Sequence, residues 1–577
     1  MRLSTLRSLV LATGGLMTVA VGCGASSRSG FDGNEQATEA TTPGDQSSSS
    51  GTSGTSGGFG GDVSGDVQLD PKNTTVVIDS ATSPATPGVV TYKVTSKGTD
   101  ASAIAKLELD DPSLGTFAGA QLTTSDMLPG DKLGVSTMVK ATTPDGQGLA
   151  RLTIVKLRKT GPQRDFFFVV PYQQDPSPKS DVLEFGTSIK QVDVAFAMDT
   201  TGSMQGSIDN LKGALSGTLL AQLQNAIPNV GLAIVDYRDY PVSPYGSKAS
   251  SGLPPLFPPT PADWPVKVRQ KITTTLATAQ AAVNQYAAGG GGDNPEAQIP
   301  AMQHILTGEA LDWSGGSVPA ATPAPGHFGA VDFRPGSVPV VVNITDISWH
   351  SETNVPYNFA TPTMASLKAA FTANNAFFVN ITSSDEAQAN ELSDATNSNV
   401  APSAFGGTCG AGKCCTGTNG SARNPSGPAG SCRLNFLHSD GSGVSAGVVK
   451  AIQAISVGAA YDVKAVPSND PTNPKGVDAT KFIQALRAMD EGNAAAGCPA
   501  VPARDSDGDG IKDTFLNVVV GTKVCFEVIP AKNGTVAPSN EPQFFNAFVD
   551  VIGVQGNIQL DKRTVLFLVP PKDPGVN

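Results

Sequence analysis

The sequence predicts a multi-domain protein in which a doubly wound, Rossmann-like α/β domain is flanked by β-sandwich domains. Its 577 residues suffice for several domains at roughly 150 residues each. Residues 66–186 and 461–577 contain short β-branched and aromatic runs separated by Pro, Gly and Asp, which is typical of sandwiches. Residues 187–460 instead alternate apolar strands with helical stretches, which indicates a mainly parallel sheet covered on both faces.

The first 22 residues have the pattern of a signal peptide. Two arginines precede an apolar stretch from Leu9 to Val21, which contains glycine and is too short for a membrane-spanning helix. The tetrapeptide Ala20-Val21-Gly22-Cys23 resembles the lipobox of bacterial lipoproteins. That resemblance implies cleavage before Cys23 and attachment of several acyl chains to it, which would anchor the protein stably to a membrane. The alternative is an ordinary secreted protein in which Cys23 has no special role.

Residues 23–65 form a predicted flexible tether behind the lipidated cysteine. They are mostly Ser, Gly, Thr and acidic residues, a composition too polar to offset the entropy lost on ordering. Gly24 rather than aspartate follows the cysteine, which by resemblance to lipoprotein sorting rules favours the outer membrane. We therefore expect an exported cell-envelope lipoprotein that faces either the periplasm or the medium.

The charged residues argue against nucleic acid as a partner. Lys and Arg total 39 against 51 Asp and Glu, which gives a net charge of −12. The basic residues are scattered rather than gathered into a stripe that could follow a phosphate backbone.

Six cysteines remain if Cys23 is lipidated, and an even number in an exported protein points to disulfides. The adjacency of Cys414 and Cys415 suits the tetrahedral spacing of a zinc site poorly, so that alternative is disfavoured. Residues 405–435 are interpreted as a small cysteine-stapled insertion. The six residues are Cys409, Cys414, Cys415, Cys432, Cys498 and Cys525.

The segments that border the central domain leave two topologies open. DFFFVVPYQQDP, which begins at Asp165, and TVLFLVPPKDP, which begins at Thr564, end alike. The flanking β regions are therefore either related sandwiches or parts of one module into which the α/β domain is inserted.

The elements of the central domain follow from the apolar runs. Strands are expected at residues 192–199, 229–237, 337–346 and 375–384. Helical stretches are expected at residues 203–226, 266–288, 295–308 and 364–374, and a last helix near 444–455 closes the domain. Two insertions rich in proline and glycine, 241–261 and 314–336, are expected to be long surface loops.

One of these strands ends on an aspartate that two hydroxyl residues follow. VDVAFAMDTTGSM places Asp199, Thr201 and Ser203 at alternate positions from the strand end. At the carboxyl end of a parallel strand such side chains can converge on one point in the crevice where these sheets bind ligands. A carboxylate and two hydroxyls are hard oxygen donors, which suit Mg²⁺, Mn²⁺ or Ca²⁺ rather than zinc or copper.

The same residues resemble the metal-ion-dependent adhesion site (MIDAS) of von Willebrand factor A domains, whose first loop reads Asp-x-Ser-x-Ser. Residues 289–304, GGGGDNPEAQIPAMQH, resemble the corresponding loop in the A-type domains of β integrins and in the DTTGSM group of bacterial A domains. VVVNITD ends on an aspartate that matches the family's second metal-site aspartate. The resemblance covers roughly residues 191–455 and implies a MIDAS formed by five residues, namely Asp199, Thr201, Ser203, Glu296 and Asp346.

Three further interpretations concern the surroundings of this site. Asp293 and Pro295 correspond to residues that serve a neighbouring cation in integrins, although Gly291 stands where those domains have an asparagine. His350 is interpreted as either a rim residue of the site or an ordinary loop histidine. The segment DYRD is interpreted as a structural ion-pair cluster of Asp236, Arg238 and Asp239.

A second oxygen cluster lies in the C-terminal region. DSDGDGIKD has four aspartates at positions 1, 3, 5 and 9, glycine at the sharp turn and Ile511, whose carbonyl could add a ligand. It resembles the DxDxDG calcium repeats of thrombospondin type-3 and dockerin-like segments, although Leu516 replaces glutamate at the twelfth position. A disulfide between Cys498 and Cys525 would close this segment. The predicted Ca²⁺ ligands are Asp505, Asp507, Asp509, Ile511 and Asp513.

The A-domain resemblance implies a binding function. The protein would supply part of the octahedron around the cation, and a carboxylate from a partner would fill the open position. We therefore expect a cell-envelope lipoprotein that binds a protein, or alternatively a polysaccharide, through a divalent cation. A scaffold that metals only rigidify is a second class. A metal-dependent hydrolase is a third and is disfavoured, because the chain has only four histidines and no legible nucleophile–base pair.

Overall fold

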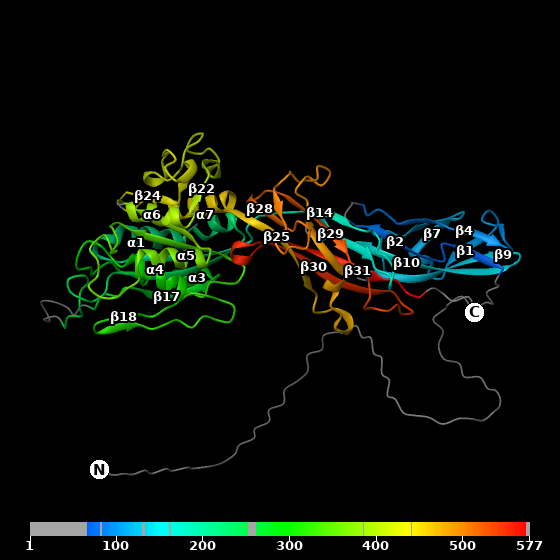
Figure 1. Cartoon of the computed structure of the whole chain (residues 1–577), viewed down its shortest axis with the longest axis horizontal. Helices are drawn as coiled ribbons and strands as arrows, with labels where there is room; N and C mark the ends of the chain where they lie inside the picture. Colours follow the sequence, from blue (N-terminus) through cyan, green and yellow to red (C-terminus); the bar gives the residue numbers. More distant parts are fainter. Residues whose placement is uncertain are drawn as a thin grey trace, which may run out of the picture. The chain divides into compact units, whose positions relative to one another are not determined.

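Figure 1 shows the structure, a computed structural model, which describes residues 66–572 except 81–83, 130–132, 158, 161–162, 218, 252–260, 385 and 440. The predicted signal peptide (1–22), Cys23 and the tether (23–65) lie outside the described residues. Among the residues that are described, no helix is long and apolar enough to cross a membrane. The described chain forms several sheets, which belong to two β domains and one α/β domain.

The N-terminal β domain contains the first ten strands. These are β1 (Val67–Asp70), β2 (Asn73–Asp79), β3 (Val89–Thr91), β4 (Lys93–Ser96), β5 (Thr99–Asp100), β6 (Lys106–Leu109), β7 (Gly115–Ala118), β8 (Gln121–Thr124), β9 (Gly134–Thr143) and β10 (Gly146–Leu157). The largest of its sheets has the order β2-β10-β9-β6. Ala150, Leu152 and Ile154 occupy alternate positions of β10 and are fully buried, because alternate side chains of a strand point to the same face.

The second β domain takes strands from two distant parts of the chain. They are β13 (Phe166–Val169), β14 (Asp181–Phe185), β25 (Ala460–Asn469), β26 (Ile483–Ala488), β27 (Ala503–Arg504), β28 (Thr514–Val519), β29 (Val524–Pro530), β30 (Gln543–Gly553) and β31 (Ile558–Val569). One sheet has the order β13-β31-β30-β25-β28-β27 and the other β14-β29-β26. The ring centroids of Phe515 and Phe526, one from each sheet, are 5.1 Å apart, so the two sheets share an aromatic core.

This pairing corrects an expected boundary, because residues 66–186 do not form one sandwich. β13 pairs in parallel with β31, with Phe166 opposite Val565, and β14 pairs antiparallel with β29. The physical reason is burial: Phe166 and Phe168 are fully buried in the core of the second β domain. Of the two topologies that the sequence left open, the insertion is observed, with residues 166–185 before the α/β domain and 460–569 after it.

The α/β domain is built on one six-stranded sheet. Its strands are β15 (Gln191–Asp199), β16 (Asn229–Tyr237), β17 (Lys267–Thr273), β20 (Val338–Thr345), β21 (Phe377–Thr382) and β24 (Asn435–Leu437). The order is β17-β16-β15-β20-β21-β24, in which only the edge strand β17 runs antiparallel to its neighbour. The strand expected at each of the four apolar runs is therefore confirmed.

Seven helices of the described chain pack on this sheet (Figure 1). They are α1 (Gln205–Ser216), α2 (Leu219–Ala226), α3 (Leu276–Val283), α4 (Gln298–Thr307), α5 (Met364–Ala373), α6 (Ala387–Ala395) and α7 (Val444–Gly458). Val194 and Phe196 of β15 pack in a core with residues of α1, α2, α3 and α7. Ala195 and Ala197 pack in a separate core with residues of α4, α5 and α6. The sheet is thus covered on both faces, as its fully apolar strands predict.

The helix expected at residues 266–288 is wrong in its first half. Residues 267–273 form β17, and only Leu276–Val283 forms a helix. Val266, Val268 and Ile272 lie at even positions and pack on the same core, which is the alternation of a strand rather than of a helix. β17 pairs with the edge of β16 that β15 leaves open. This pairing outweighs the helical propensity of the polar residues between Val266, Val268 and Ile272.

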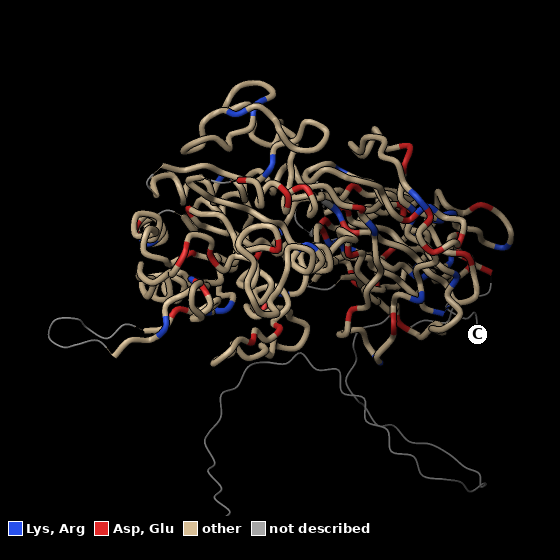
Figure 2. Tube along the Cα trace, turned by 60° about the vertical axis from the view of Figure 1, so that its left-hand side comes forward, with Lys and Arg blue, Asp and Glu red and all other residues tan. Residues whose placement is uncertain are grey.

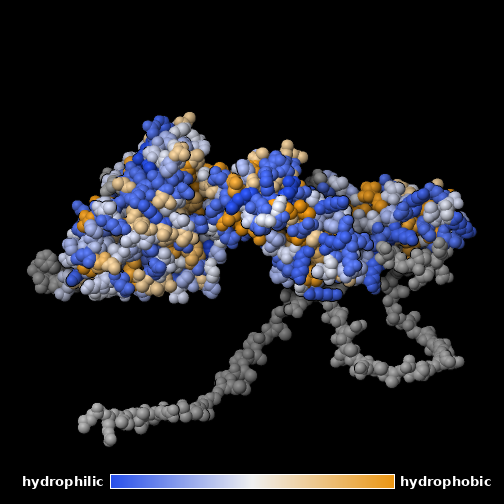
Figure 3. Space-filling model, viewed as in Figure 1, coloured by the Kyte–Doolittle hydropathy of each residue, from blue (hydrophilic) through white to orange (hydrophobic). Residues whose placement is uncertain are grey.

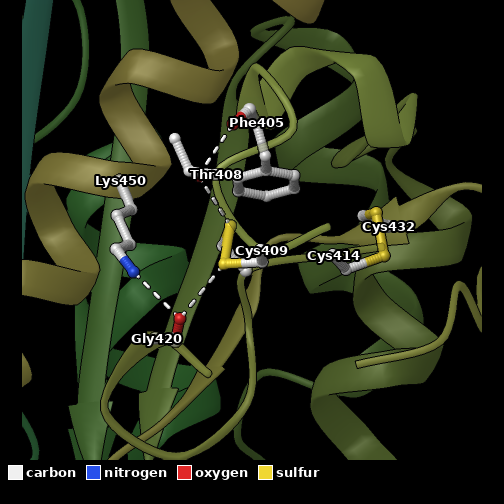
Figure 4. The surroundings of a disulfide bond; sticks show 8 residues. Phe405, Thr408, Cys409, Cys414, Gly420, Cys432 and Lys450 are labelled. Atoms are coloured by element: carbon white, nitrogen blue, oxygen red, sulfur yellow. Dashed lines mark hydrogen bonds between the residues drawn. A yellow bond between two sulfur atoms is a disulfide. The ribbon is translucent and has the colours of Figure 1, made fainter. Parts of the chain in front are cut away.

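Three disulfides are present among the described residues, as expected. They join Cys409 to Cys415, Cys414 to Cys432 and Cys498 to Cys525. Figure 4 shows the cysteine-rich insertion beside α7, where Lys450 donates a hydrogen bond of 2.9 Å to the Gly420 carbonyl. Disulfides of this number are typical of proteins that fold in an oxidising compartment outside the cytoplasm.

The charged residues of the described chain are of both signs. Figure 2 shows acidic and basic residues interspersed along the chain. On the face shown in Figure 3, hydrophobic residues occur in small groups between hydrophilic ones.

Candidate functional site

The predicted ligands come together at the carboxyl end of the parallel sheet. Thr201, Ser203, Glu296 and Asp346 line one pocket of about 440 Å³, whose wall also includes Gly290 to Gly292. Ser203 lies in the short helical turn Gly202–Met204 between β15 and α1, and Asp346 directly follows β20. β15 and β20 are parallel neighbours in the sheet, which explains why residues so distant in the sequence meet.

Asp199, the last residue of β15, is fully buried and is not part of the pocket wall. Its Oδ1 accepts hydrogen bonds from the backbone N–H and the hydroxyl of Thr201, at 2.9 and 2.7 Å. Its Oδ2 accepts a hydrogen bond of 2.8 Å from the Thr345 hydroxyl. Burial raises the pKa of Asp199 to about 6, although these hydrogen bonds oppose the shift. The carboxylate is therefore oriented both by its own loop and by β20.

Glu296 is the second buried carboxyl group of the site. It lies in the turn before α4, and only 4% of the residue is exposed. Its Oε2 has no hydrogen-bond partner within the described part of the chain. Burial, followed by the negative charge of Asp199 and other nearby acids, raises the pKa of Glu296 to about 11. A buried carboxyl oxygen without a partner is unfavourable, and a bound cation would satisfy it.

A glycine loop brings the backbone close to the pocket and depends on Asp263. Asp263 Oδ2 accepts hydrogen bonds from the backbone N–H of Gly291 at 3.0 Å and of Ser247 at 2.6 Å. Gly290 has a φ of +77°, and a Cβ atom there would lie 1.9 Å from Asp263 Oδ1. Only glycine can therefore occupy this position without displacement of the loop. The sequence does not predict Asp263 as part of the site, because no motif surrounds this residue.

The interpretation of Asp236, Arg238 and Asp239 as structural ion-pair residues at a strand end is confirmed, although their partners lie outside the DYRD segment. Asp236 pairs with Arg269 at 2.6 Å, and Arg238 pairs with Asp263 at 3.3 Å. Asp236 lies on β16, and Arg238 and Asp239 directly follow its last residue, so each of the three meets a partner from another part of the chain.

Asp239 pairs instead with His350, whose side chain is fully buried. His350 Nε2 lies 3.0 Å from Asp239 Oδ2 and 3.3 Å from Asp293 Oδ1, while Nδ1 lies 2.5 Å from the Val355 carbonyl. Burial opposes protonation, but the hydrogen bond and charge of Asp239 outweigh it and raise the pKa of His350. His350 is therefore neither an exposed rim residue nor an ordinary loop histidine. Its Nε2 and the two carboxylates lie close enough to share one cation.

A ladder of buried amides holds the strand ends in register. The Tyr237 hydroxyl donates to Asn343, Asn343 donates to Asn380, and Asn380 donates to Asn435, each at 2.8 Å. These four residues lie on β16, β20, β21 and β24, near the end of the sheet that carries the pocket. A shift of one residue in the register of these strands would leave a buried amide without a hydrogen bond. The hydrogen-bonded series therefore fixes how far along the sheet each strand ends, and with it the positions of the site residues.

The predicted calcium loop lies between β27 and β28. Asp505, Asp507 and Asp509 each place a carboxylate oxygen within 4.8 Å of the other two. Asp505 accepts backbone hydrogen bonds from Gly510 at 2.9 Å and from Gly508 at 2.7 Å. These hydrogen bonds lower the pKa of Asp505, because they stabilise its charged form.

The remaining two residues of that prediction lie differently. Asp513 is not part of the group, because it pairs with Lys464 of β25 at 2.7 Å and accepts a hydrogen bond from Ser506. The backbone N–H of Ile511 donates to Asp509 at 2.7 Å. Three of the four predicted acids thus meet, and the fourth is held by the sheet.

Comparison with known proteins assigns no family to the chain: no protein-family model and no curated protein matches it. Among solved structures, it is similar to the pilus adhesin SpaC of Lactobacillus rhamnosus GG in its open conformation, with 10% sequence identity and a TM-score of 0.25. The match covers 75% of this chain and 47% of the adhesin, so this chain spans about half of that protein's length. A score this low does not establish a common fold.

Proposed function

We propose that residues 187–460 form a von Willebrand factor A domain whose MIDAS binds a divalent cation, Mg²⁺ or alternatively Mn²⁺ or Ca²⁺, and through it a carboxylate of a partner protein. One observation carries this proposal. Thr201, Ser203, Glu296 and Asp346 line one pocket at the carboxyl end of the sheet, and Glu296 has a buried oxygen there to which no described residue donates a hydrogen bond. Oxygen donors of this kind fit these cations.

The chain's own residues would divide the work of the site. Glu296, once a cation displaces its proton, and Asp346 supply carboxylate oxygens at the pocket wall, and Ser203 offers an exposed hydroxyl. Asp199 orients Thr201 through two hydrogen bonds, and so sets the position of that hydroxyl. A bound cation would supply the positive charge that attracts a carboxylate from outside. A polysaccharide would offer the cation mainly hydroxyls and is therefore the weaker alternative.

We propose binding rather than hydrolysis at this site. A hydrolase would need a base beside the pocket to activate water. His350 is the histidine nearest in sequence to Asp346, and both its ring nitrogens face oxygen acceptors. Both ring nitrogens of His350 are therefore engaged with protein oxygens, and neither faces the pocket as a base for water. Turnover of generic ester or phosphate substrates by the metal-loaded protein would contradict this proposal.

We propose further that the protein is a cell-envelope lipoprotein whose Cys23 carries the lipid anchor, and that Asp505, Asp507 and Asp509 bind Ca²⁺. The three disulfides support a location outside the cytoplasm. The proximity of three carboxylates supports the calcium loop, because their mutual repulsion favours a bound cation. The calcium would stiffen the second β domain rather than contact a partner.

The test of the adhesion site compares Asp199→Asn and Ser203→Ala with wild type. Asparagine keeps an oxygen that accepts the Thr201 hydrogen bonds but removes the charge, so we expect Mg²⁺ affinity to fall by at least roughly 100-fold. Ser203→Ala should weaken Mg²⁺ binding less, because it removes one neutral ligand. Ser216→Ala, an exposed serine at the far end of α1, is the matched control and should bind as wild type does.

Each variant is titrated with Mg²⁺ by calorimetry and then used to retain proteins from an envelope extract, with Mg²⁺ and again with chelator. The proposal expects retention by wild type and by Ser216→Ala that chelator abolishes, and no retention by Asp199→Asn. Full Mg²⁺ affinity in a folded Asp199→Asn protein would refute the adhesion site. Mg²⁺ binding that raises the melting temperature without any Mg²⁺-dependent retention would instead favour the scaffold.

A further inference from the structure

Three side chains from three different loops meet beside the proposed adhesion site. Asp239 follows β16, Asp293 directly follows the glycine loop, and His350 lies in the loop after β20. His350 Nε2 is 3.0 Å from Asp239 Oδ2 and 3.3 Å from Asp293 Oδ1. One ligand atom from each of the three residues lies within 4.8 Å of the other two. None of them belongs to the five residues predicted for the adhesion site.

Asp239 has one oxygen to which no described residue donates a hydrogen bond. Its side chain is fully buried. Its Oδ1 accepts hydrogen bonds from the Tyr357 hydroxyl at 2.6 Å and from the Tyr240 backbone N–H at 2.5 Å. Its Oδ2 faces His350 but accepts no hydrogen bond, because the ring nitrogen is aligned with Asp293 instead. A buried carboxylate oxygen in this state is unfavourable, and a cation among the three side chains would satisfy it.

The surroundings of His350 hold its ring so that one nitrogen faces both acids. Nδ1 contacts the Val355 carbonyl at 2.5 Å, which leaves Nε2 toward the carboxylates. Histidines that bind metals typically contact a backbone carbonyl or a carboxylate through their other ring nitrogen. The ring centroids of Tyr357 and Tyr245 lie 4.3 and 5.2 Å from that of His350. Because the Tyr357 hydroxyl also holds Asp239, one residue orients two of the three ligands.

The ligand atoms of this group differ from those of the adhesion site. They are one imidazole nitrogen and two carboxylate oxygens, whereas the adhesion site offers oxygens alone. Imidazole suits Zn²⁺ and other transition ions, while Mg²⁺ and Ca²⁺ prefer oxygen throughout. Ligands at roughly 2.0–2.1 Å from a tetrahedral Zn²⁺ are about 3.4 Å apart. The separations of 3.0 and 3.3 Å around His350 Nε2 are close to that value.

The resemblance to integrin A domains implies a neighbouring cation with other ligands. Pro295 is buried next to Glu296 and contributes no side-chain oxygen, and Gly291 stands where those domains have an asparagine. Of the positions that the resemblance names, Asp293 alone offers a side-chain oxygen here. Asp239 and His350 complete the ligand set from outside those positions. The donor set therefore fits a neighbouring ion, but one of a different chemical class.

The burial of the group indicates how an ion would reach it. Asp293 lines the pocket and its side chain is 24% exposed. Asp239 and His350 have fully buried side chains and are not part of the pocket wall. An ion would thus enter past Asp293 and exchange slowly. Ions at the adhesion site should exchange faster, because most of its predicted ligands line the pocket.

We propose that Asp239, Asp293 and His350 bind one transition-metal ion of the Zn²⁺ class. This ion would join the end of β16, the glycine loop and the loop after β20. It would fix the segment that carries Glu296 three residues beyond Asp293. The site has its own ligands and its own metal, so its occupancy does not depend on the proposed adhesion site.

The test measures Zn²⁺ bound to the full-length protein by equilibrium dialysis, with saturating Mg²⁺ and Ca²⁺ present to fill the other two proposed sites. We expect about one Zn²⁺ per chain. His350→Gln and Asp293→Asn should each lower the Zn²⁺ affinity by at least roughly 100-fold, since loss even of a residue that only orients a ligand typically costs about 10–100-fold. His327→Gln, the same change in a different loop, and Ser203→Ala, in the adhesion site, should leave Zn²⁺ binding unchanged.

Co²⁺ provides a second measurement, because a four-coordinate Co²⁺ ion absorbs visible light much more strongly than a six-coordinate one. Strong absorption by wild type that His350→Gln abolishes would support the proposal. No bound Zn²⁺ in wild type, or full affinity in a folded Asp293→Asn protein, would overturn it. Asp293 is partly exposed, so this variant decides the matter if His350→Gln does not melt cooperatively. Loss of Zn²⁺ in Ser203→Ala but not in His350→Gln would place the ion in the adhesion site and overturn the proposal as well. Zn²⁺ binding without Mg²⁺-dependent retention of partner proteins would refute the adhesion site alone.

Discussion

The raised pKa of Glu296 predicts how the affinity of the site for Mg²⁺ depends on pH. Burial and then the charge of Asp199 raise the pKa of Glu296 to about 11, so the metal-free protein keeps this carboxyl group protonated at neutral pH. A protonated carboxyl group is a poor ligand, and a cation that binds there must displace the proton. We therefore predict that Mg²⁺ binding releases a proton and becomes tighter as the pH rises.

The magnitude follows from linkage. Each cation that displaces one proton gains roughly tenfold in affinity per pH unit, or about 1.4 kcal/mol, as long as the pH stays below the pKa of the free group. Between pH 7 and 9 the Kd for Mg²⁺ should therefore fall by roughly 100-fold. Asp199, whose pKa is raised to about 6, adds a second proton below that pH, so the dependence becomes steeper there. Because both pKa values are raised, protons compete with Mg²⁺ for these carboxyl groups, and Mg²⁺ binding must weaken as the pH falls.

The assay is calorimetric titration with Mg²⁺ at several pH values, in buffers whose ionisation enthalpies differ, so that released protons are counted directly. Glu296→Gln keeps the shape of the side chain but has no proton to lose. It should bind Mg²⁺ more weakly and show a nearly flat pH dependence above pH 7. Glu309→Gln, an exposed glutamate just after α4, is the matched control. An affinity that does not change with pH in wild type, or the same slope in Glu296→Gln, would show that Glu296 is not a ligand.

Three more perturbations test separate parts of the chain. Asp507→Ala should abolish the drop in melting temperature that chelation causes in the second β domain, and an unchanged drop would exclude the calcium loop. Gly290→Ala should abolish Mg²⁺ binding, because its Cβ would meet Asp263, whereas Gly326→Ala has the same φ of +77° and no atom within 4 Å of its Cβ. Both glycine variants should pay the shared backbone strain of roughly 1 kcal/mol, so equal Mg²⁺ affinities would refute the steric argument. Cys23→Ser should release the protein from the membrane fraction, and retention there would contradict the lipid anchor.

The convergence of the candidate ligands on one pocket could be predicted from the sequence, because these residues follow strands that are apolar throughout. Asp199 ends one such run, and Thr201 and Ser203 follow it within a few residues, so their convergence needs no knowledge of strand order. Asp346 ends a second run of the same kind. Parallel strands covered on both faces are recognisable locally, since burial on both sides removes the alternation of a half-exposed strand.

The residues that support the ligands could not be predicted in this way. The bond from the Gly291 backbone to Asp263 spans 28 residues, and the sequence around Asp263 has no distinguishing pattern. His350 is buried only because Asp239 and Asp293, from two other loops, meet it. The domain to which β13 belongs could not be predicted either, because a short aromatic run does not reveal which distant strand will pair with it.

The insertion of the α/β domain sets the order in which the chain can assemble. Asn533 donates a hydrogen bond to the Val170 carbonyl across 363 residues of sequence, and the pairing of β13 with β31 spans even more. The six strands of the α/β domain all lie between residues 191 and 437, so a chain that emerges amino-terminus first can complete this domain early. The aromatic strand Phe166–Val169 must wait for the final strand before it is covered. A chain truncated ahead of β31 would thus complete the α/β domain and its candidate pocket while the second β domain remained incomplete.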